Sequence, residues 1–273
     1  MNASENSLAF GLSFLASGIP NSYEALADAV NKLYADLHQK PKGMAASLSN
    51  GKIIHRAYSP KTLREAVLEP SALEVHLGDV TNLDDVIVDC FLRPIDPTRK
   101  FFGDRWIAVT GPTQALQKQS LQAFLMAVVD IYPIVQGGLG GYRSHAQAAR
   151  ESSLSGAFSP SEVDAHTRER LREDAMLSGQ FLRRLRRLYP VTIIGPEIWA
   201  QLSPMPAIDP PPKVEDLGNC KMVTAWPELV EPRDPAFLAG TKELRRWLWP
   251  FTIQNPADAI DAPPPEPVPE PFF

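Results

Sequence analysis

A corner motif occurs twice in this chain, each time as a short apolar run that meets Gly-Pro and continues into a helical pattern. The first copy is WIAVTGPTQAL at 106–116, and the second is VTIIGPEIWAQL at 191–202. A short, continuous apolar run bounded by turn residues is consistent with a buried strand. Proline at the first helical position, with glycine before it, favours a strand-to-helix corner. Two ordinary corners explain the repeat more simply than an internal duplication, and both predict strands mixed with helices.

Hydrophobic periodicity extends this pattern over most of the chain. It predicts an α/β or α+β fold class, with one mixed β-sheet of roughly five to eight strands packed by several helices. Residues 1–258 are expected to form a single globular domain, with the helices at 22–39 and 113–131 packed on the sheet. The predicted strands lie at 8–16, 52–58, 72–77, 86–92, 105–110, 191–194 and 221–225, and the other predicted helices at 161–176, 177–188 and 236–248.

Residues 133–155 differ from this pattern because four glycines are followed by a run of small and polar residues. We predict a long loop, and long loops within compact domains are often functional. Tyr142 and Arg143 lie inside it, with no helical or strand face to join. Tyrosine and arginine are enriched at binding hot spots, so both are candidate contact residues.

The C-terminal residues 259–273 form an acidic tail in which prolines alternate with other residues. Closely spaced prolines are incompatible with a helix or a central strand, so this tail is expected to be extended and similar to polyproline II. Phe272 and Phe273 are candidate anchors that would hold the tail on the body of the protein or on a partner.

Charge and cysteine usage narrow the classes of function. The 273 residues carry a formal net charge of −5, which disfavours a role in binding nucleic acid or an anionic membrane. The apolar stretch at 8–18 has no Lys or Arg before it, so it is interpreted as a strand rather than a signal peptide. Cys90 and Cys220 have no metal-ligand companions and are expected to be reduced packing residues. These features predict a cytoplasmic protein.

Sequence motifs of common enzymes are missing. The chain contains no P-loop, no GxGxxG, no GxSxG and no HExxH, and its five histidines are widely scattered. We therefore expect no cofactor, no metal and no catalytic residue. The arginines near 183–187 are interpreted as the solvent side of an amphipathic helix, with phosphate binding as the less favoured alternative.

Residues 62–96 are the most charge-biased part of the body, with eight carboxylates and two arginines, a formal charge of −6. Three interpretations remain open for them: a solvated acidic face, a face for a basic partner, and a metal site. Asp89 lies in a predicted strand, and Lys100 and Asp104 follow it, which is a residue set that a metal-dependent nuclease also uses.

The segment RRLYPVTIIGPEIWAQL, followed by FLAGTKELRRWLWPFTIQNPAD, resembles bacterial immunity proteins associated with type VI secretion effectors. The likeness covers about residues 85–258. It implies a single α/β or α+β domain in the cytoplasm that binds and neutralises a cognate toxin by occluding it. Immunity families diverge together with their toxins, so no functional residue is carried over by position.

An acidic chain without catalytic motifs is compatible with an inhibitor of a basic toxin. The hypothesis places carboxylates where they engage the Lys and Arg groups of the toxin. The candidate partner-binding residues are Glu74, Asp79, Asp84, Asp85, Tyr142 and Arg143. The alternatives are a metal-dependent hydrolase with Asp89 and Asp104 among its carboxylates, and a structural subunit of a bacterial or phage assembly.

Overall fold

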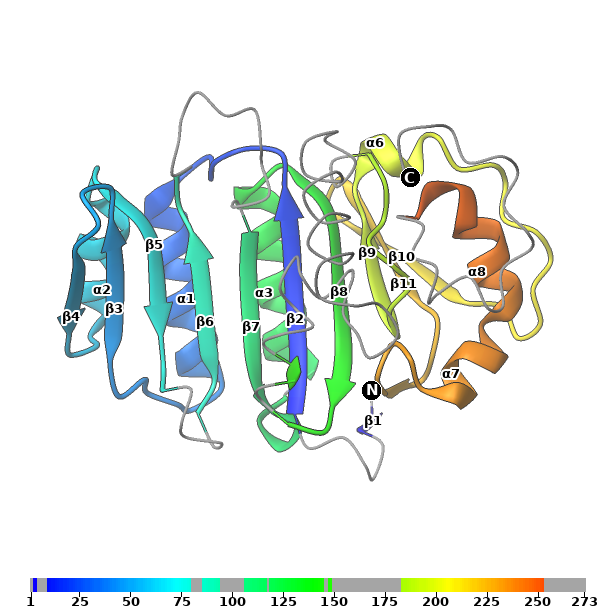
Figure 1. Cartoon of the computed structure of the whole chain (residues 1–273), viewed down its shortest axis with the longest axis horizontal. Coiled ribbons are helices and arrows are strands. Elements are labelled where there is room, and N and C mark those ends of the chain that lie inside the picture. Colours follow the sequence, from blue (N-terminus) through cyan, green and yellow to red (C-terminus); the bar gives the residue numbers. More distant parts are fainter. Residues whose placement is uncertain are drawn as a thin grey trace, which may run out of the picture.

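A computed structural model describes residues 2–3, 9–79, 85–93, 106–116, 118–144, 147–148 and 183–252. Their dominant feature is one ten-stranded sheet with helices on it, so the predicted α+β class is confirmed (Figure 1). The predicted proline-rich tail at 259–273 lies outside the described residues.

The sheet is larger than predicted, and every strand pair in it is antiparallel rather than mixed. A separate parallel pair joins β1 (Asn2–Ala3) to β12 (Glu228–Leu229). In spatial order, the ten strands are β10 (Lys213–Leu217), β11 (Cys220–Thr224), β9 (Val191–Ile194), β8 (Ile134–Tyr142), β2 (Ala9–Ala16), β7 (Trp106–Pro112), β6 (Ile87–Phe91), β5 (Ala72–Leu77), β3 (Met44–Leu48) and β4 (Ile53–Arg56).

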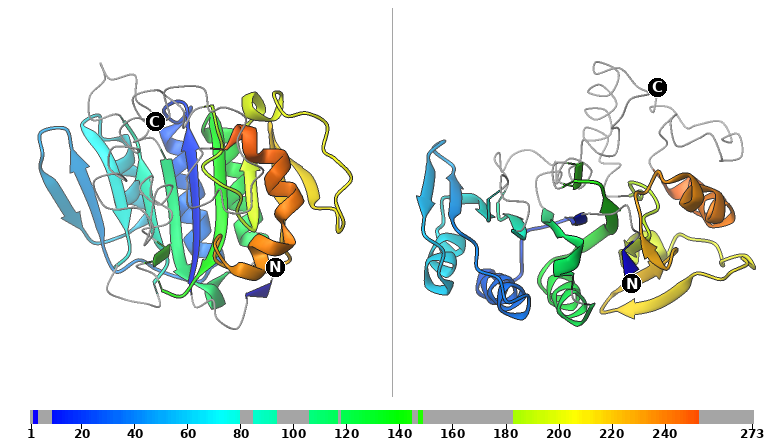
Figure 2. Two further views of the ribbon diagram at one scale, coloured as in Figure 1. Left: turned by 45° about the vertical axis from the view of Figure 1, so that its right-hand side comes forward. Right: turned by 90° about the horizontal axis from the view of Figure 1, so that it is seen from below.

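Three helices cover one face of the sheet: α1 (Tyr23–Asp36), α2 (Pro60–Leu68) and α3 (Lys118–Ile131) (Figure 2). Ser22 caps α1 by accepting a hydrogen bond from the Ala25 N–H at 3.1 Å. One side of α1 carries buried residues at helical spacing, which pack with α3 and the sheet in the main hydrophobic core. The prediction that the helices at 22–39 and 113–131 pack on the sheet is therefore confirmed.

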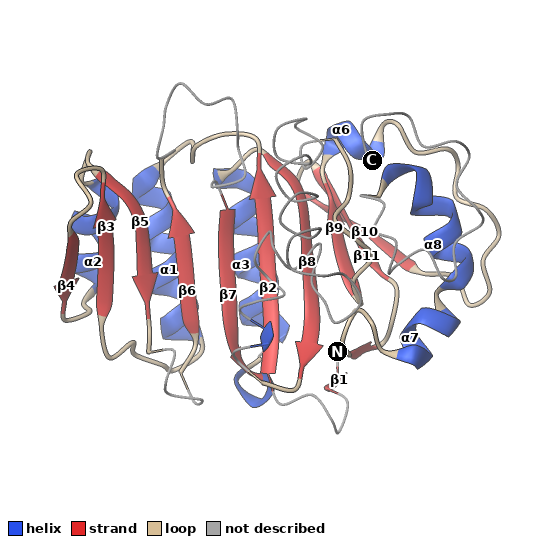
Figure 3. Cartoon of the chain, viewed as in Figure 1, coloured by secondary structure: helices blue, strands red, loops and turns tan. Residues whose placement is uncertain are grey.

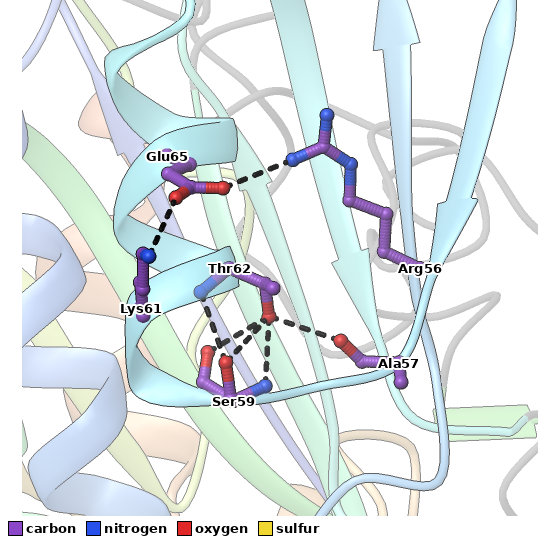
Figure 4. A network of polar contacts seen from close by, with 6 residues as sticks. All are labelled: Arg56, Ala57, Ser59, Lys61, Thr62 and Glu65. Atoms are coloured by element: carbon purple, nitrogen blue, oxygen red, sulfur yellow. Dashed lines mark hydrogen bonds and ion pairs between the residues drawn. The ribbon is translucent and has the colours of Figure 1, made fainter.

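A capping network fixes the start of α2 beside the edge strand β4 (Figure 4). Ser59 Oγ accepts from the Thr62 N–H at 3.1 Å, while Thr62 Oγ1 accepts from the Ser59 N–H at 2.8 Å. Thr62 Oγ1 also lies 3.0 Å from the carbonyl oxygen of Ala57. The Arg56 guanidinium pairs with Glu65 at 3.2 Å, which ties β4 to the helix. This network holds the β3–β4 hairpin against α2.

Near β9 and β11 both faces of the sheet are covered (Figure 3). Ile193 belongs to the main core, whereas its neighbour Ile194 belongs to a second core with Phe237 and Leu248. Successive residues of a strand point to opposite faces, so β9 contributes to both cores. The second core involves α6 (Pro196–Trp199), α7 (Pro235–Gly240), α8 (Lys242–Leu248) and the short helix η4 (Trp249–Phe251). The helix predicted at 236–248 is thus two helices joined at Thr241.

The predicted loop at 133–155 is wrong over its first part, because 134–142 form the central strand β8 and every residue of β8 is buried. Its glycines let aromatic rings lie directly on the strand. A Cβ at Gly137 would come within 2.7 Å of Phe14 Cδ1, and one at Gly138 would overlap the ring of Tyr189. The apolar side chains that cover this strand therefore come from other segments of the chain. Hydrophobic periodicity within 133–155 does not reveal them.

The prediction of a helix at 177–188 is also wrong over its described end. Residues 183–190 form turns and an isolated bridge rather than a helix. Arg186 and Arg187 are each 7% exposed, so neither lies on a solvent-facing side. Arg186 Nε donates to Tyr189 Oη at 2.8 Å, which shows how a buried guanidinium is satisfied there.

Candidate functional site

The face of β4, β3, β5 and β6 opposite α1 and α2 is the candidate site, and we call it the open face. Within the described part of the chain, no helix covers it (Figures 1 and 2). Its side chains are half-buried or exposed at His55, Glu74, His76 and Asp89. The strand registers place His76 directly opposite Asp89 on β6 and Ala45 on β3, and Ala45 lies opposite His55 on β4.

A histidine–carboxylate pair lies at the centre of the open face. Nδ1 of His76 on β5 shares a short hydrogen bond with Oδ1 of Asp89 on β6. The hydrogen bond to Asp89 raises the pKa of His76 above its ordinary value, although burial opposes the shift. The carboxylates of Glu74 and Asp79 raise this pKa further. The pair therefore favours a protonated imidazole that is held by carboxylates.

Glu74 lies two residues before His76 on β5 and points to the same face. Burial is the main reason that its pKa is raised, followed by the nearby charge of Asp89, while His76 opposes the shift. A carboxylate that is partly desolvated gains more from a cationic partner than a fully hydrated one does. Glu74 is therefore positioned to accept a cationic group from outside.

A broad, open hollow of about 630 Å³ lies at one end of the open face. The hollow combines two cations and two histidines with only one carboxylate, so its wall is not uniformly acidic. The lining residues are Lys42, Gly43, Met44, Ala45, His55, Arg56, Ala57, His76, Gly78 and Asp79. Such a mixture is suited to polar contacts of both signs, as at a protein–protein interface.

The predicted acidic surface at 62–96 does not gather on one face. Glu74 lies on the open face, and Asp79 lines the hollow at its end. One carboxylate oxygen of Asp85 is buried, and the carbonyl of the next residue, Val86, accepts a hydrogen bond from the Tyr34 hydroxyl on α1 at 2.9 Å, so Asp85 lies next to a contact with α1. Asp84 lies outside the described residues. The charge run in the sequence is thus not confined to the open face.

Tyr142 has a different environment from the one predicted, whereas Arg143 is accessible at the surface. Tyr142 is 1% exposed and packs with Ala9 and Ala148, so it is a core residue and not a contact on the surface. Arg143 is exposed, with 80% of its side-chain surface accessible, and it pairs with Glu231 at 3.2 Å. Three strands separate β8 from β5, so Arg143 is not part of the open face.

Sequence reasoning missed the role of His76. The only signal in the sequence is that Glu74 and His76 share the alternation of one strand, and that Asp89 lies in the next predicted strand. Strand register decides whether residues 76 and 89 meet, and a shift of one residue would put them on opposite faces. Register is set by the turn geometry and by the hydrophobic pattern of both strands together.

No group of three or more His, Cys, Asp or Glu residues within the described ranges is arranged to hold a metal ion. Of the residues considered for a hydrolase, Asp89 pairs with His76, while Lys100 and Asp104 lie outside the described residues. Cys90 and Cys220 are free and buried, as predicted. Burial raises the pKa of the Cys220 thiol to about 11 and raises that of Cys90 even further. Neither thiol is therefore activated as a nucleophile.

Comparison with known proteins identifies a shared fold but no family. No family model matches the chain, and no curated protein matches it. Among solved structures, the Pseudomonas aeruginosa T6SS protein PA0821 is similar, with a TM-score of 0.57 at 14% sequence identity. The match covers 90% of this chain and 73% of that one. At this identity the likeness concerns the fold alone. None of the helices in the described ranges has the length and apolar character needed to cross a membrane.

Proposed function

We propose that this chain is an immunity protein of a type VI secretion system, which binds a cognate toxin and neutralises it by occluding its active surface. The observation that carries the proposal is the fold shared with a T6SS protein over 90% of the chain. The resemblance of the segments at 186–202 and 237–258 to T6SS-associated immunity proteins supports it independently. The same proposal places the protein in the cytoplasm, where it would meet the toxin.

The open face is the proposed interface. Glu74 and Asp79 would receive Lys or Arg groups of a basic toxin, and the hollow beside His55 and His76 would take one of its side chains. Asp85 and Tyr142 are left out of the interface because of where their side chains lie, and Asp84 stays a candidate outside the described residues. Arg143 remains a candidate for a second contact, separate from the open face.

The proposed mechanism is steric and electrostatic rather than chemical. Carboxylates at an interface steer a basic partner during encounter and fix its register after contact. Removing such charges lowers the association rate and makes it less dependent on salt, whereas a truncated buried anchor mainly raises the dissociation rate. The association rate at two ionic strengths therefore reports directly on Glu74 and Asp79.

The experiment first tests the products of the reading frames that adjoin this chain's gene for toxicity, and a toxic product then serves as the effector. We expect the double variant Glu74→Gln with Asp79→Asn to associate several-fold more slowly at low salt and with a weaker salt dependence. The matched control is Glu197→Gln, because Glu197 is an exposed carboxylate on α6, away from the open face. Protection of a sensitive host by co-expression is measured in parallel.

Three outcomes decide between the proposals. If the wild-type chain neither binds the effector nor protects the host, the immunity function is wrong. If the double variant and the control behave alike, the function stands but the open face is not the interface. The hydrolase alternative gains support only if Mg²⁺ or Mn²⁺ raises the melting temperature, since ligands that bind the native state stabilise it.

A further inference from the structure

β4 forms one edge of the ten-stranded sheet, next to the open face. Among the described residues, β4 pairs with β3 on one side and with no strand on the other. Its side chains are mostly exposed, including Ile53, which is 60% exposed. Unpaired strand edges are templates for pairing with another chain, so proteins usually shorten, charge or cover them.

The hydrogen-bond pattern between β3 and β4 shows which backbone groups of β4 point away from the sheet and could pair with another strand. The Leu48 N–H donates to the Lys52 carbonyl at 2.8 Å, so Lys52 faces inward, towards β3. Inward and outward positions alternate along an antiparallel strand, so the N–H and C=O groups of Ile53 and His55 point outward. The next outward carbonyl, that of Ala57, is contacted by Thr62 in the capping network. The available edge therefore consists of Ile53 and His55.

A groove runs beside this edge on the helix side of the sheet. It has a volume of about 560 Å³, within the range typical of ligand pockets. Its floor is apolar and comes from β3, β4 and the end of α2, where Leu68 is 40% exposed. The lining residues are Met44, Ala46, Leu48, Ile54, Arg56, Glu65, Ala66, Leu68, Glu69, Pro70 and Ser71. A strand added to β4 would direct every second side chain towards this groove.

We propose that β4 is a docking edge that takes one extended segment of the partner protein as an eleventh, antiparallel strand. The segment exchanges backbone hydrogen bonds with Ile53 and His55. It places an apolar side chain opposite Ile54 and in the groove, with carboxylates two residues away on each side, opposite Lys52 and Arg56. This inference rests on the proposed function only for the identity of the partner.

A second copy of the chain fits this edge poorly. Pairing two copies through both available residues places Ile53 of one copy opposite His55 of the other. The same register brings Lys52 opposite Arg56 twice. Like charges directly opposite each other destabilise a strand pair. The two cations thus deter self-association, and they favour a partner strand with carboxylates at those positions.

The chain's own acidic tail has carboxylates at the spacing that the β4 edge requires, but it lacks the backbone N–H donors. Glu266, Val268 and Glu270 have the predicted spacing, with Val268 as the central apolar residue. In that register Pro267 and Pro269 would have to donate hydrogen bonds to the edge, and proline has no N–H. A segment from a partner protein meets both requirements.

The test is a titration with a synthetic peptide, Ser-Glu-Thr-Leu-Val-Glu-Ser with blocked ends, followed by backbone amide NMR of the full chain. Saturable shifts of the amides of Ile53 and His55 are expected by about 5 mM peptide, since short strands bind weakly. The control peptide is N-methylated at Thr and Val, the two residues that face the edge. We expect it to bind about tenfold more weakly or worse, because two backbone hydrogen bonds are lost.

Protein variants make the test specific. Ile53→Pro removes only an outward-facing N–H, a change that edge strands tolerate, and it should weaken binding several-fold because one backbone hydrogen bond is lost. Ile53→Thr keeps the N–H and should still bind. Lys52→Glu should weaken binding of the peptide, and a peptide with Lys at the facing position should restore it.

Several results would overturn the inference. These are the absence of shifts at β4, shifts that survive N-methylation, and sedimentation that shows a dimer dissociated by Ile53→Pro. The inference would also be wrong if the peptide bound only after residues 259–273 had been deleted, because the tail would then be the segment that occupies the edge. If the peptide fails while the wild-type chain still protects a host from the toxin, only the docking edge is wrong. If the chain gives no protection, the immunity proposal fails regardless of the peptide result.

Discussion

The two halves of the sheet differ in how their strands are covered. In the central half, all residues of β2 and β8 are buried, so both faces of these strands pack against other parts of the protein. In the outer half, β3 and β5 mix buried with accessible residues, and β4 has no buried residue. The central half therefore supplies stability, whereas the outer half has one face and one edge accessible to a partner. This division is why function is assigned to the outer half.

The largest expected effect on stability comes from a substitution at the centre of the sheet. Leu12 on β2 is 0% exposed, and we expect Leu12→Ala to lower the free energy of unfolding by about 2–5 kcal/mol, through lost burial and the cavity that remains. The matched substitution in the outer half is Leu68→Ala, which should cost about 0.5 kcal/mol, because Leu68 is 40% exposed. Urea denaturation measures both, and equal losses would contradict the division into halves.

A second prediction concerns the glycines of β8. Gly138→Ala would push a Cβ into the ring of Tyr189, so we expect a loss of about 1–3 kcal/mol from overpacking. Gly43→Ala is the control in the outer half, because a Cβ there would meet no atom within 4 Å. Urea midpoints of the two variants should separate clearly. A stable Gly138→Ala protein would show that Tyr189 does not need the space above the strand.

The sequence predicted those helices and strands whose hydrophobic pattern and capping residues lie within one continuous segment. The strand at 72–77 and the helix that follows Ser22 were predicted because alternation and a capping serine occur within one segment. β8 was missed because its neighbours Phe14 and Tyr189 supply the apolar contacts that its glycines lack. β3 and β10 were missed because small or charged residues fill them.

The candidate site was less accessible than the fold. Glu74 and Asp79 were identified by charge alone, yet the same charge run also included Asp85, which has a buried carboxylate oxygen, and Glu65, which lies on α2. A list of carboxylates along the chain does not say which face of a strand each one occupies. The meeting of His76 with Asp89 depends on the register between two strands, and neither strand determines that register alone.

The smallest expected effect is a dependence of stability on pH in the outer half. The pKa of His76 is raised in the folded protein, mainly by its hydrogen bond to Asp89, so the folded state binds this proton more tightly than the unfolded chain. The stabilising contribution is fully present below about pH 6.5 and is lost as the pH rises through the folded pKa. This slope amounts to less than about 1 kcal/mol; His76→Gln should remove it, and Asp89→Asn should reduce it. Urea titrations from about pH 5.5 to 8.5 measure it, and an unchanged slope in both variants would contradict the pairing.

Hydrogen exchange of the backbone amides, with and without a toxin that the chain is found to bind, tests the assignment of function to the outer half most directly. Binding at the open face and the β4 edge should slow exchange at Ile53–Arg56 and Ala72–Leu77. It should leave α7 and α8, at Pro235–Gly240 and Lys242–Leu248, unchanged. Slower exchange at α7 and α8, with no change in β4 and β5, would place the partner on the opposite end of the sheet and contradict the account.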